Sequence, residues 1–345
     1  MKALFIGGTG VISTAVSALA LARGWELTLL NRGTSAARVP AGARVVTADI
    51  HDEDAVKAVL GDERFDVVAD FIAFTEADVQ RDARLFAGRT AQYIFISSAS
   101  AYQKPVAALP ITESTPLANP YWQYSRDKIA CEDFLMAQYR TAGFPVTIVR
   151  PSHTYCGGKA VVALHGACGG WQTLARIRAG KPVIIPGDGT SLWTATHADD
   201  FAVGLVGLMG NPHALGAAVH ITTDEGMTWN QIYAVLAAAM GAPLCAAYVS
   251  SKFLAVCGRA AGYDFEGPLL GDKAANVRFD NTKIKRLVPD FAPRISMAQG
   301  IRSAVEYLLA HPELQTPDPE FDAWCDRVLV AQSAARAVFD GAHLA

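Results

Sequence analysis

Short apolar runs alternate with segments that are apolar at helical spacing along the first half of the chain. The first run, residues 3–6, breaks into Gly7, Gly8 and Gly10, and residues 14–23 then continue at helical spacing. This order predicts a strand, a tight turn and a helix. Further strands are predicted at 27–30, 44–50, 65–72 and 93–98, and helices at 52–60, 75–88 and 124–142. Strands and helices that alternate over short connections predict an α/β fold, a Rossmann-type doubly wound parallel sheet.

The composition limits the class of protein. The 345 residues are 51% hydrophobic and 18% charged, which indicates a globular chain with a large core. A net charge of −3 without a basic stripe makes nucleic acid an unexpected partner. The six cysteines form no C-x-x-C pair, so we expect free cytosolic thiols and no metal site. No apolar run reaches the length of a membrane span, so we expect a soluble cytoplasmic protein.

The glycine turn is the first candidate binding feature. A helix that opens directly behind such a turn presents unpaired backbone N–H groups and the positive end of its dipole, which suit a pyrophosphate. Gly7 and Gly10 fit the first two positions of a G-x-x-G-x-x-G dinucleotide-binding turn, and Ser13 occupies the third. Serine is the next smallest choice where the helix must lie close to the strand.

The end of the second predicted strand bears on the choice of dinucleotide. An acid at this position would accept hydrogen bonds from the ribose 2′-hydroxyl and repel a 2′-phosphate. The chain has Asn31 followed by Arg32, and a guanidinium pairs with phosphate, so NADP is favoured with NAD as the alternative. A solvated turn arginine is the plain structural interpretation. Asp49 and Ile50 stand where an adenine edge could be held.

Catalytic chemistry is suggested by three residues. Ser98, or its neighbour Ser97, closes the predicted strand at 93–98, and Tyr124 and Lys128 are four residues apart on one face of the next helix. A nearby ammonium favours the phenolate, so the tyrosine could exchange a proton with an alcohol while hydride moves to or from the cofactor. The serine hydroxyl would orient the same substrate oxygen.

Together these motifs resemble the extended short-chain dehydrogenase/reductase family, the NAD-dependent epimerase/dehydratase group, with an atypical glycine turn. The resemblance extends through the segments at 150–157, 187–200 and 280–284. It implies that Ser98 orients the substrate and that Tyr124 is the acid/base. It also implies that Lys128 anchors the nicotinamide ribose and lowers the tyrosine's pKa.

The resemblance also implies a division of the chain and a set of contacts. Residues 1–157 would form the dinucleotide-binding domain, with later strands returning to the sheet near 197–223. Residues 158–196 and 224–345 would form mainly a smaller C-terminal substrate lobe and the C-terminal helices, and 249–270 part of a lid. The expected cofactor contacts are Gly7, Thr9, Gly10, Val11, Ile12, Asn31, Arg32, Asp49, Ile50, Phe71, Ile72, Ser97, Tyr124, Lys128, Pro151 and His153. The expected substrate contacts are Ser98, Ser100, Tyr124, His153 and Trp193.

Departures from the family pattern narrow the function. Dehydratases of the family carry an Asp-Glu pair where this chain has Ala99 and Ser100, so dehydration is disfavoured. Nucleotide-sugar epimerases usually have arginine at the position of Trp193 and asparagine at that of His153, which weakens the case for a nucleotide sugar. Trp193 would be either a stacking face or a core or lid aromatic. His153 would be either a substrate contact or a hydrogen-bonded structural histidine.

Two functional hypotheses remain. The first is an NADP-using oxidoreductase or epimerase that acts on a secondary hydroxyl of a sugar-like substrate through a keto intermediate or product. The second is an RNA- or nucleotide-binding protein on a retained dehydrogenase scaffold, since the glycine turn also resembles an atypical branch that includes chloroplast stem-loop-binding proteins. By analogy with the family, a homodimer would form through the tyrosine helix, with Ile129, Phe134 and Leu135 as its apolar face.

Overall fold

The computed structural model of the chain describes residues 1–33 and 38–339. Its centre is a seven-stranded sheet in the order β11-β6-β5-β4-β1-β2-β3, in which every neighbouring pair is parallel. The strands are β1 (Lys2–Ile6), β2 (Glu26–Asn31), β3 (Arg44–Thr47), β4 (Phe65–Asp70), β5 (Thr90–Ile96), β6 (Val146–Pro151) and β11 (Ala218–Ile221). The predicted doubly wound parallel sheet is therefore confirmed.

Helices cover both faces of this sheet, which explains why its strands are apolar on both sides. Ala3 and Phe5 of β1 pack toward α1 (Val11–Ala22) and α6 (Ala198–Leu208). Leu4 and Ile6 of the same strand pack on the other side, toward α2 (Glu53–Leu60), α3 (Glu76–Phe86) and α4 (Gln123–Ala142). All four side chains are fully buried.

Some predicted boundaries are wrong by a few residues, for local reasons. Helix α1 begins three residues earlier than predicted, directly after Gly10. Strand β3 ends at Thr47, because the chain then turns at Asp49, whose carboxylate accepts a hydrogen bond from the backbone N–H of His51 at 3.0 Å. The apolar spacing of residues 201–209 predicts a helix there, but α6 begins earlier, at Ala198, because Nδ1 of His197 caps it and accepts from the N–H of Asp199 at 3.2 Å.

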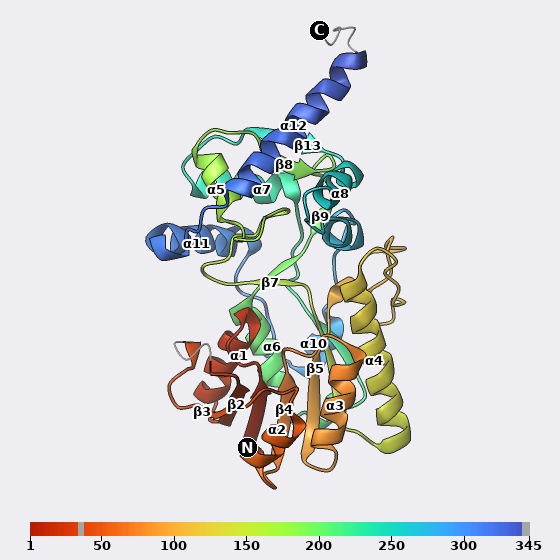
Figure 1. Cartoon of the computed structure of the whole chain (residues 1–345). Helices are drawn as coiled ribbons and strands as arrows, with labels where there is room; N and C mark the ends of the chain where they lie inside the picture. Colours follow the sequence, from red (N-terminus) through yellow and green to blue (C-terminus); the bar gives the residue numbers. More distant parts are fainter. Residues whose placement is uncertain (34–37, 340–345) are drawn as a thin grey trace.

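A second lobe lies above the carboxyl ends of the sheet strands in Figure 1. It contains three two-stranded sheets that pair β7 (His153–Tyr155) with β10 (Ala195–His197), β8 (Val183–Pro186) with β13 (Ala246–Val249), and β9 (Leu192–Trp193) with β12 (Met227–Thr228). Most of these strands were not predicted, since two to four residues carry too little pattern. The remaining helices are α5 (Trp171–Arg178), α7 (Trp229–Ala239), α8 (Ser251–Arg259), α9 (Glu266–Pro268), α10 (Thr282–Leu287), α11 (Met297–Ala310) and α12 (Pro319–Phe339).

The structure also bears on two surface questions. Leu135 is fully buried in the core between α4 and the sheet, so it is not available for the apolar dimer face expected on α4. Ile129 and Phe134 are half-buried.

Within residues 1–33 and 38–339 no helix combines the length and apolar character needed to cross a membrane.

Candidate functional site

The turn between β1 and α1 is shaped for the close approach of a ligand. Gly7 has a φ of 80°, a conformation that favours glycine, and a Cβ there would lie 2.4 Å from Cγ2 of Ile72. Ser13, which replaces the third glycine, is buried and ties the turn together. Its hydroxyl donates to the carbonyl of Gly7 and accepts from the N–H of Gly10, both at 2.8 Å. The serine therefore keeps the close packing that the glycine would allow and adds two hydrogen bonds.

A cleft of about 430 Å³ runs from this turn along the carboxyl ends of the central strands. It brings together eight of the predicted cofactor residues, namely Gly7, Thr9, Gly10, Asn31, Arg32, Asp49, Ile50 and Ile72. Leu30, Ala48, His51 and Phe74 also line it and were not predicted. The first backbone N–H groups of α1 have no partners within the helix and face the space that a pyrophosphate would need. The donor set and the glycine-lined floor fit a dinucleotide.

A second cavity of about 220 Å³ adjoins the N-terminus of α1 and contains the predicted reaction chemistry. The predicted residues that line it are Ile12, Ser98, Ser100, Tyr124, Pro151, His153 and Trp193. Ala99, Trp122, Ser152, Thr194, Asp272, Val277 and Phe279 complete its wall. The rings of Phe74, in the first cleft, and Tyr124, in the second, have centroids 6.4 Å apart. The two hollows are therefore neighbours at the tyrosine.

The Ser98 hydroxyl is oriented by a chain of hydroxyl groups. Ser100 lies 2.8 Å from Ser98 and 2.8 Å from Ser125, measured between the side-chain oxygens. Ser125 follows Tyr124 on α4. The chain fixes the Ser98 hydroxyl relative to the helix that carries the tyrosine. Ser100 is buried but also lines the cavity, so the substrate contact predicted for it stays a prediction.

Lys128 lies deeper than the family resemblance implies. Its ammonium donates to the carbonyls of Ala73 at 2.6 Å and Ile96 at 2.8 Å, and it lines neither hollow. It sits 4.6 Å from the centroid of the Phe74 ring and 5.8 Å from that of Tyr124. Burial lowers the pKa of Lys128 to about 8. Lys128 is therefore not exposed to the cleft in this structure. Its role as an anchor for the nicotinamide ribose stays a prediction.

The protonation of Tyr124 also differs from the expectation. Burial raises the pKa of its phenol above the ordinary value, and the nearby Ser98 hydroxyl offsets part of that rise. Asp272 raises the pKa further. The lowering expected from Lys128 does not outweigh this rise, and the Lys128 ammonium donates to two backbone carbonyls. The phenol is consequently a proton donor at neutral pH.

Ser97 was the alternative to Ser98, and the structure separates their roles. Ser97 is buried and its hydroxyl donates to Glu132 at 2.5 Å, away from both hollows. Glu132 in turn holds the guanidinium of Arg150, with contacts of 2.9 and 2.5 Å. The Ser97 hydroxyl is therefore occupied by a buried ion pair, and a cofactor contact at Ser97 stays a prediction. Ser98 is the residue that faces the tyrosine's cavity.

Two other predicted cofactor contacts are not lining side chains. Phe71 packs its ring against Phe5, with centroids 5.3 Å apart, and contributes to the core beside α1. Val11 is half-buried at the first position of α1 and lines neither hollow, so a cofactor contact there stays a prediction. Sequence reasoning placed these residues near the site but did not resolve which way each side chain turns.

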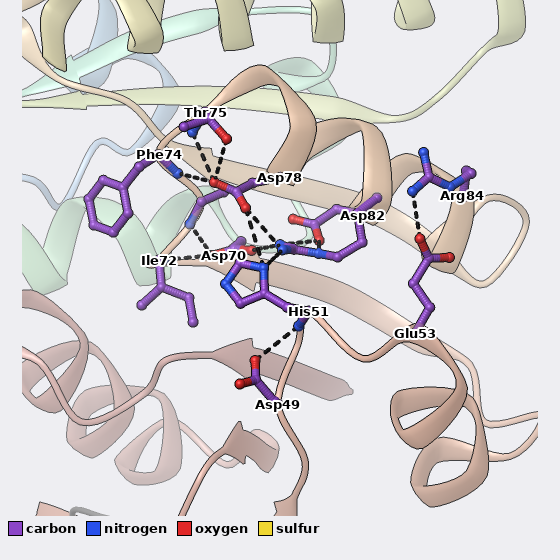
Figure 2. A network of polar contacts seen from close by, with 12 residues as sticks. Asp49, His51, Glu53, Asp70, Ile72, Phe74, Thr75, Asp78, Asp82 and Arg84 are labelled. Carbon is purple, nitrogen blue, oxygen red and sulfur yellow. Dashed lines mark hydrogen bonds and ion pairs between the residues drawn. The ribbon is translucent and has the colours of Figure 1, made fainter. Parts of the chain in front are cut away.

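A buried polar network holds the loop that follows β4 (Figure 2). Asp70 accepts hydrogen bonds from the N–H groups of Ile72 at 2.6 Å and Ala73 at 2.8 Å. Asp78 accepts from the N–H groups of Phe74 and Thr75 at 3.0 and 2.9 Å. Burial alone would raise the pKa of Asp78, but these hydrogen bonds outweigh it, and the pKa is lowered. The carboxylates thus fix the backbone that presents Ile72 and Phe74 to the cleft.

One arginine forms ion pairs with the carboxylates of this network. Arg81 contacts Asp78 at 3.0 Å, Asp82 at 2.8 Å and Asp70 at 3.7 Å, and its side chain is almost fully buried. Burial and the neighbouring charge of Asp70 raise the pKa of Asp82 well above its ordinary value. Asp82 also accepts a hydrogen bond from the hydroxyl of Tyr93 at 2.6 Å.

The same arginine sets the proton position on His51. Nη1 of Arg81 lies 3.0 Å from Nδ1 of His51, and because the guanidinium is always charged, Nδ1 must accept. The other ring nitrogen then carries the proton, and Figure 2 shows it on the side of the ring that faces Ile72. His51 lines the dinucleotide cleft and therefore offers this N–H as a donor there.

Trp193 does not present a free stacking face. Its ring lies between those of His153 and Trp229, at centroid distances of 4.7 and 4.6 Å, and the residue is 1% exposed. This burial favours the interpretation of Trp193 as a core aromatic, while the residue still lines the cavity and a substrate contact there stays a prediction. His153 is exposed to the cavity yet lies deep in the protein, and this desolvation, with the charge of Lys273, lowers its pKa. His153 is therefore neutral.

The part of the chain that the structure describes contains no group of three or more histidine, cysteine, aspartate or glutamate side chains able to hold a metal ion. The polar side chains that line the two hollows supply hydroxyl groups, a phenol, two imidazoles, an amide, the guanidinium of Arg32 and the carboxylates of Asp49 and Asp272. Such a set can position a dinucleotide and exchange a proton with a carbonyl or an alcohol.

Comparison with known proteins agrees with this geometry. Residues 3–221 match the NAD dependent epimerase/dehydratase family. The chain is 29% identical over 255 residues to 2′-dehydrokanamycin reductase from Streptomyces kanamyceticus, covering 74% of this chain and 71% of that protein. It is 28% identical over 255 residues to chloroplast stem-loop binding protein of 41 kDa b from Arabidopsis thaliana, covering 70% and 64% respectively.

Solved structures agree with the fold. UDP-glucose 4-epimerase from Thermotoga maritima, solved with UDP-glucose, superposes with a TM-score of 0.71 at 21% identity, over 90% of this chain and 99% of that one. At this identity the likeness establishes the architecture of sheet and lobe.

The glycine turn yields a prediction with a matched control. Gly7→Ala and Gly24→Ala both place a Cβ at a φ near 80°, which costs about 1–2 kcal/mol in each case. Only the Gly7 variant meets a neighbour, since nothing lies within 4 Å of a Cβ at Gly24. We expect Gly7→Ala to weaken NADPH binding by at least about tenfold in a fluorescence titration. Equal affinities of the two variants would refute the assigned role of the turn.

Proposed function

The chain belongs to the NAD dependent epimerase/dehydratase family and is an enzyme of the extended short-chain dehydrogenase/reductase type. On that premise we propose that it is an NADP-dependent oxidoreductase that interconverts a ketone and a secondary alcohol on a sugar-like substrate. The observation that carries the proposal is the Tyr124 phenol beside the Ser98 hydroxyl in a cavity that adjoins the dinucleotide cleft.

The dinucleotide would be held by the glycine turn, the N-terminus of α1 and the rim formed by Asn31, Arg32 and Asp49. When bound, its nicotinamide supplies or accepts the hydride. Ser98 would donate a hydrogen bond to the substrate oxygen, and the hydroxyl chain through Ser100 would keep it in place. Tyr124 would give its proton to that oxygen during ketone reduction and take it back during alcohol oxidation.

The protonated state of Tyr124 favours the reductive direction. A phenol whose pKa is raised by burial keeps its proton at neutral pH, so it is ready to act as an acid. Lys128, held below the ring, provides a positive charge that stabilises the phenolate left after proton transfer. A relative whose name describes a reductase, 2′-dehydrokanamycin reductase, supports reduction of a keto sugar. An epimerase would instead return the hydride to the other face of the same ketone and show no net change in the dinucleotide.

The rim of the cleft supports NADP over NAD. Asn31 uses its side-chain oxygen to accept from the N–H of Gly33 at 3.0 Å, so the end of β2 carries a neutral amide where an acid would favour the ribose 2′-hydroxyl of NAD. Arg32 follows it, exposed at the rim. A guanidinium there would pair with the 2′-phosphate through charge-assisted hydrogen bonds.

Two alternatives are weaker on this structure. Ala99 and Ser100 leave the position after Ser98 without the carboxylates that expulsion of water from a sugar requires. The relative named as a stem-loop binding protein raises RNA binding as a second function. The net charge of −3 opposes it, because non-specific binding of nucleic acid depends on neutralising phosphates.

The catalytic tyrosine is tested by Tyr124→Phe. Loss of the phenolic proton should lower kcat for NADPH-dependent reduction of a keto-sugar panel by about 10²- to 10⁴-fold while NADPH binding persists. Tyr121→Phe is the control, because Tyr121 lies three residues earlier, is exposed and lines neither hollow. Undiminished turnover in the Tyr124 variant would rule out the proposed chemistry. RNA retention on a filter that falls steeply with salt would then favour the second function.

The dinucleotide preference is tested by Arg32→Ala. Charge-assisted contacts to a 2′-phosphate contribute about 1.5–3 kcal/mol, so we expect the variant to lose about tenfold or more of its affinity for NADPH and little for NADH. Arg23→Ala, at the C-terminal end of α1, should change neither affinity, because the dinucleotide cleft lies at the N-terminal end of this helix. An unchanged ratio of the two dissociation constants in the Arg32 variant would favour NAD as the physiological dinucleotide.

The pKa of Lys128 predicts an upper limit to the pH range of activity. An ammonium is charged below its pKa, so the charge that stabilises the phenolate is lost as the pH rises through about 8. We expect kcat/KM to fall over that range, since this ratio reports groups of the free enzyme. Lys128→Met should have low activity without this fall, whereas Lys57→Met, an exposed substitution on α2, should keep it. A profile that stays flat from pH 7 to 10 in the unmodified enzyme would contradict the role of Lys128.

A further inference from the structure

We propose that Asp272 selects a substrate that carries a protonated amine near the reacting carbon. This inference rests on the proposed function, because it concerns the substrate of the same cavity. It adds a class of substrate, amino-bearing sugars, and a specificity-determining residue that the sequence alone did not indicate.

Asp272 belongs to an unusual segment of the wall. Residues Leu269–Lys273 form a π-helix, a geometry that is rare and frequent at functional sites. Asn119 ties this segment to the catalytic loop, because its side-chain nitrogen donates to the carbonyl of Gly271 at 2.7 Å and to that of Ser100 at 2.8 Å. The position of Asp272 is therefore coupled to the loop that carries Ser98.

The same segment packs closely on the aromatic residue before the catalytic helix. A Cβ at Gly267 would lie 2.2 Å from Trp122, and one at Gly271 would lie 2.9 Å from it. The ring of Trp122 has its centroid 4.9 Å from that of Tyr124. The segment that was expected to form a lid thus contacts the cavity wall beside the tyrosine, and no loop movement is needed to bring Asp272 there.

The charge of the cavity points to a cation. Among the described residues that line it, Asp272 is the only one with a charged side chain, and the one titratable base, His153, is neutral. One carboxylate oxygen accepts from the indole N–H of Trp193 at 3.2 Å. Trp193 is itself fixed between His153 and Trp229, so the carboxylate has a defined position.

The nearest lysines do not line this cavity. Lys273 lines a neighbouring hollow that it shares with His165 and Asp264. Lys104 is buried, and no hydrogen-bond partner reaches its ammonium within the described residues. Within the described residues, neither lysine is within ion-pair distance of Asp272. Burial lowers the pKa of both lysines, and the charge of Asp272 offsets part of that lowering. A phosphate in the cavity would therefore meet a carboxylate and no cationic side chain.

The amine would also assist the chemistry of the tyrosine. The negative charge of Asp272 raises the pKa of Tyr124 and so opposes loss of its proton. An ammonium paired with Asp272 would cancel that charge at the moment when the phenol gives up its proton. A charge-assisted hydrogen bond is about twice as strong as a neutral one, so an amine is preferred to a hydroxyl at the same position.

The experiment compares three probes, D-glucosamine, D-glucose and D-glucose 6-phosphate, by calorimetric titration of the NADP⁺-loaded protein at mildly acidic pH. We expect D-glucosamine to bind at least about tenfold more tightly than D-glucose, and the phosphate to bind least. Asp272→Asn should abolish the preference for the amine. Asp264→Asn is the matched control, since Asp264 lies on the same connection but lines the neighbouring hollows and not this cavity.

Three results would overturn the proposal: equal binding of amine and alcohol, retention of the preference in Asp272→Asn, or no binding of D-glucosamine. The titration is repeated without NADP⁺, and Tyr124→Phe is titrated in parallel. A protein that fails to bind NADP⁺ yet prefers the amine through Asp272 would refute the proposed function and keep this inference. A protein that reduces keto sugars through Tyr124 but shows no preference for the amine would refute this inference and keep the proposed function.

Discussion

The arrangement of the site depends on one buried ammonium. Lys128 reaches from α4 to the carbonyl of Ala73, in the loop after β4, and to that of Ile96, at the end of β5. Three segments that are distant in sequence are thereby held at one edge of the sheet. Burial works against the charge and lowers the pKa of Lys128 to about 8, so the two carbonyls must compensate for the water that it has lost. Tyr124, one turn earlier on the same helix, takes its position from this contact.

The buried carboxylates extend the same principle to the dinucleotide cleft. Asp70 and Asp78 hold backbone N–H groups of the loop that follows β4, and Arg81 holds the carboxylates. The loop is therefore rigid before any ligand arrives, which reduces the entropy lost on binding. The Glu132–Arg150 pair does the same for Ser97 at the end of β5, since Glu132 lies one turn after Lys128 on α4.

Much of the architecture could be predicted from the sequence, because periodicity reports burial. The strands at the centre of the sheet and the helices between them follow directly from apolar runs such as residues 3–6 and 65–70. The glycine turn and the placement of Ser98 and Tyr124 near one another follow from the rule that strand ends share one edge. The short strand pairs of the second lobe could not be predicted, since two residues such as Leu192 and Trp193 define no period.

The direction in which each side chain points was the main feature that could not be predicted from the sequence. Ser97 and Ser98 are adjacent and chemically identical, yet one binds a buried glutamate and the other faces the cavity. From the sequence, Trp193 could be either a stacking face or a core aromatic, and only the structure shows that its ring packs against those of His153 and Trp229. Asp272 is 148 residues beyond Tyr124 in the sequence, and no local motif links the two. Such contacts arise from tertiary packing, which a linear pattern reports only on average.

The most direct test of the account is a crystal structure of the protein with bound NADP⁺. The account predicts the adenosine between Arg32 and Asp49, the pyrophosphate at the N-terminus of α1, and the nicotinamide over the cavity that Ser98 and Tyr124 line. One substrate carbon should then fit between the nicotinamide and the phenolic oxygen, at roughly van der Waals contact with both. A nicotinamide directed away from Tyr124, or a dinucleotide bound elsewhere on the chain, would contradict it.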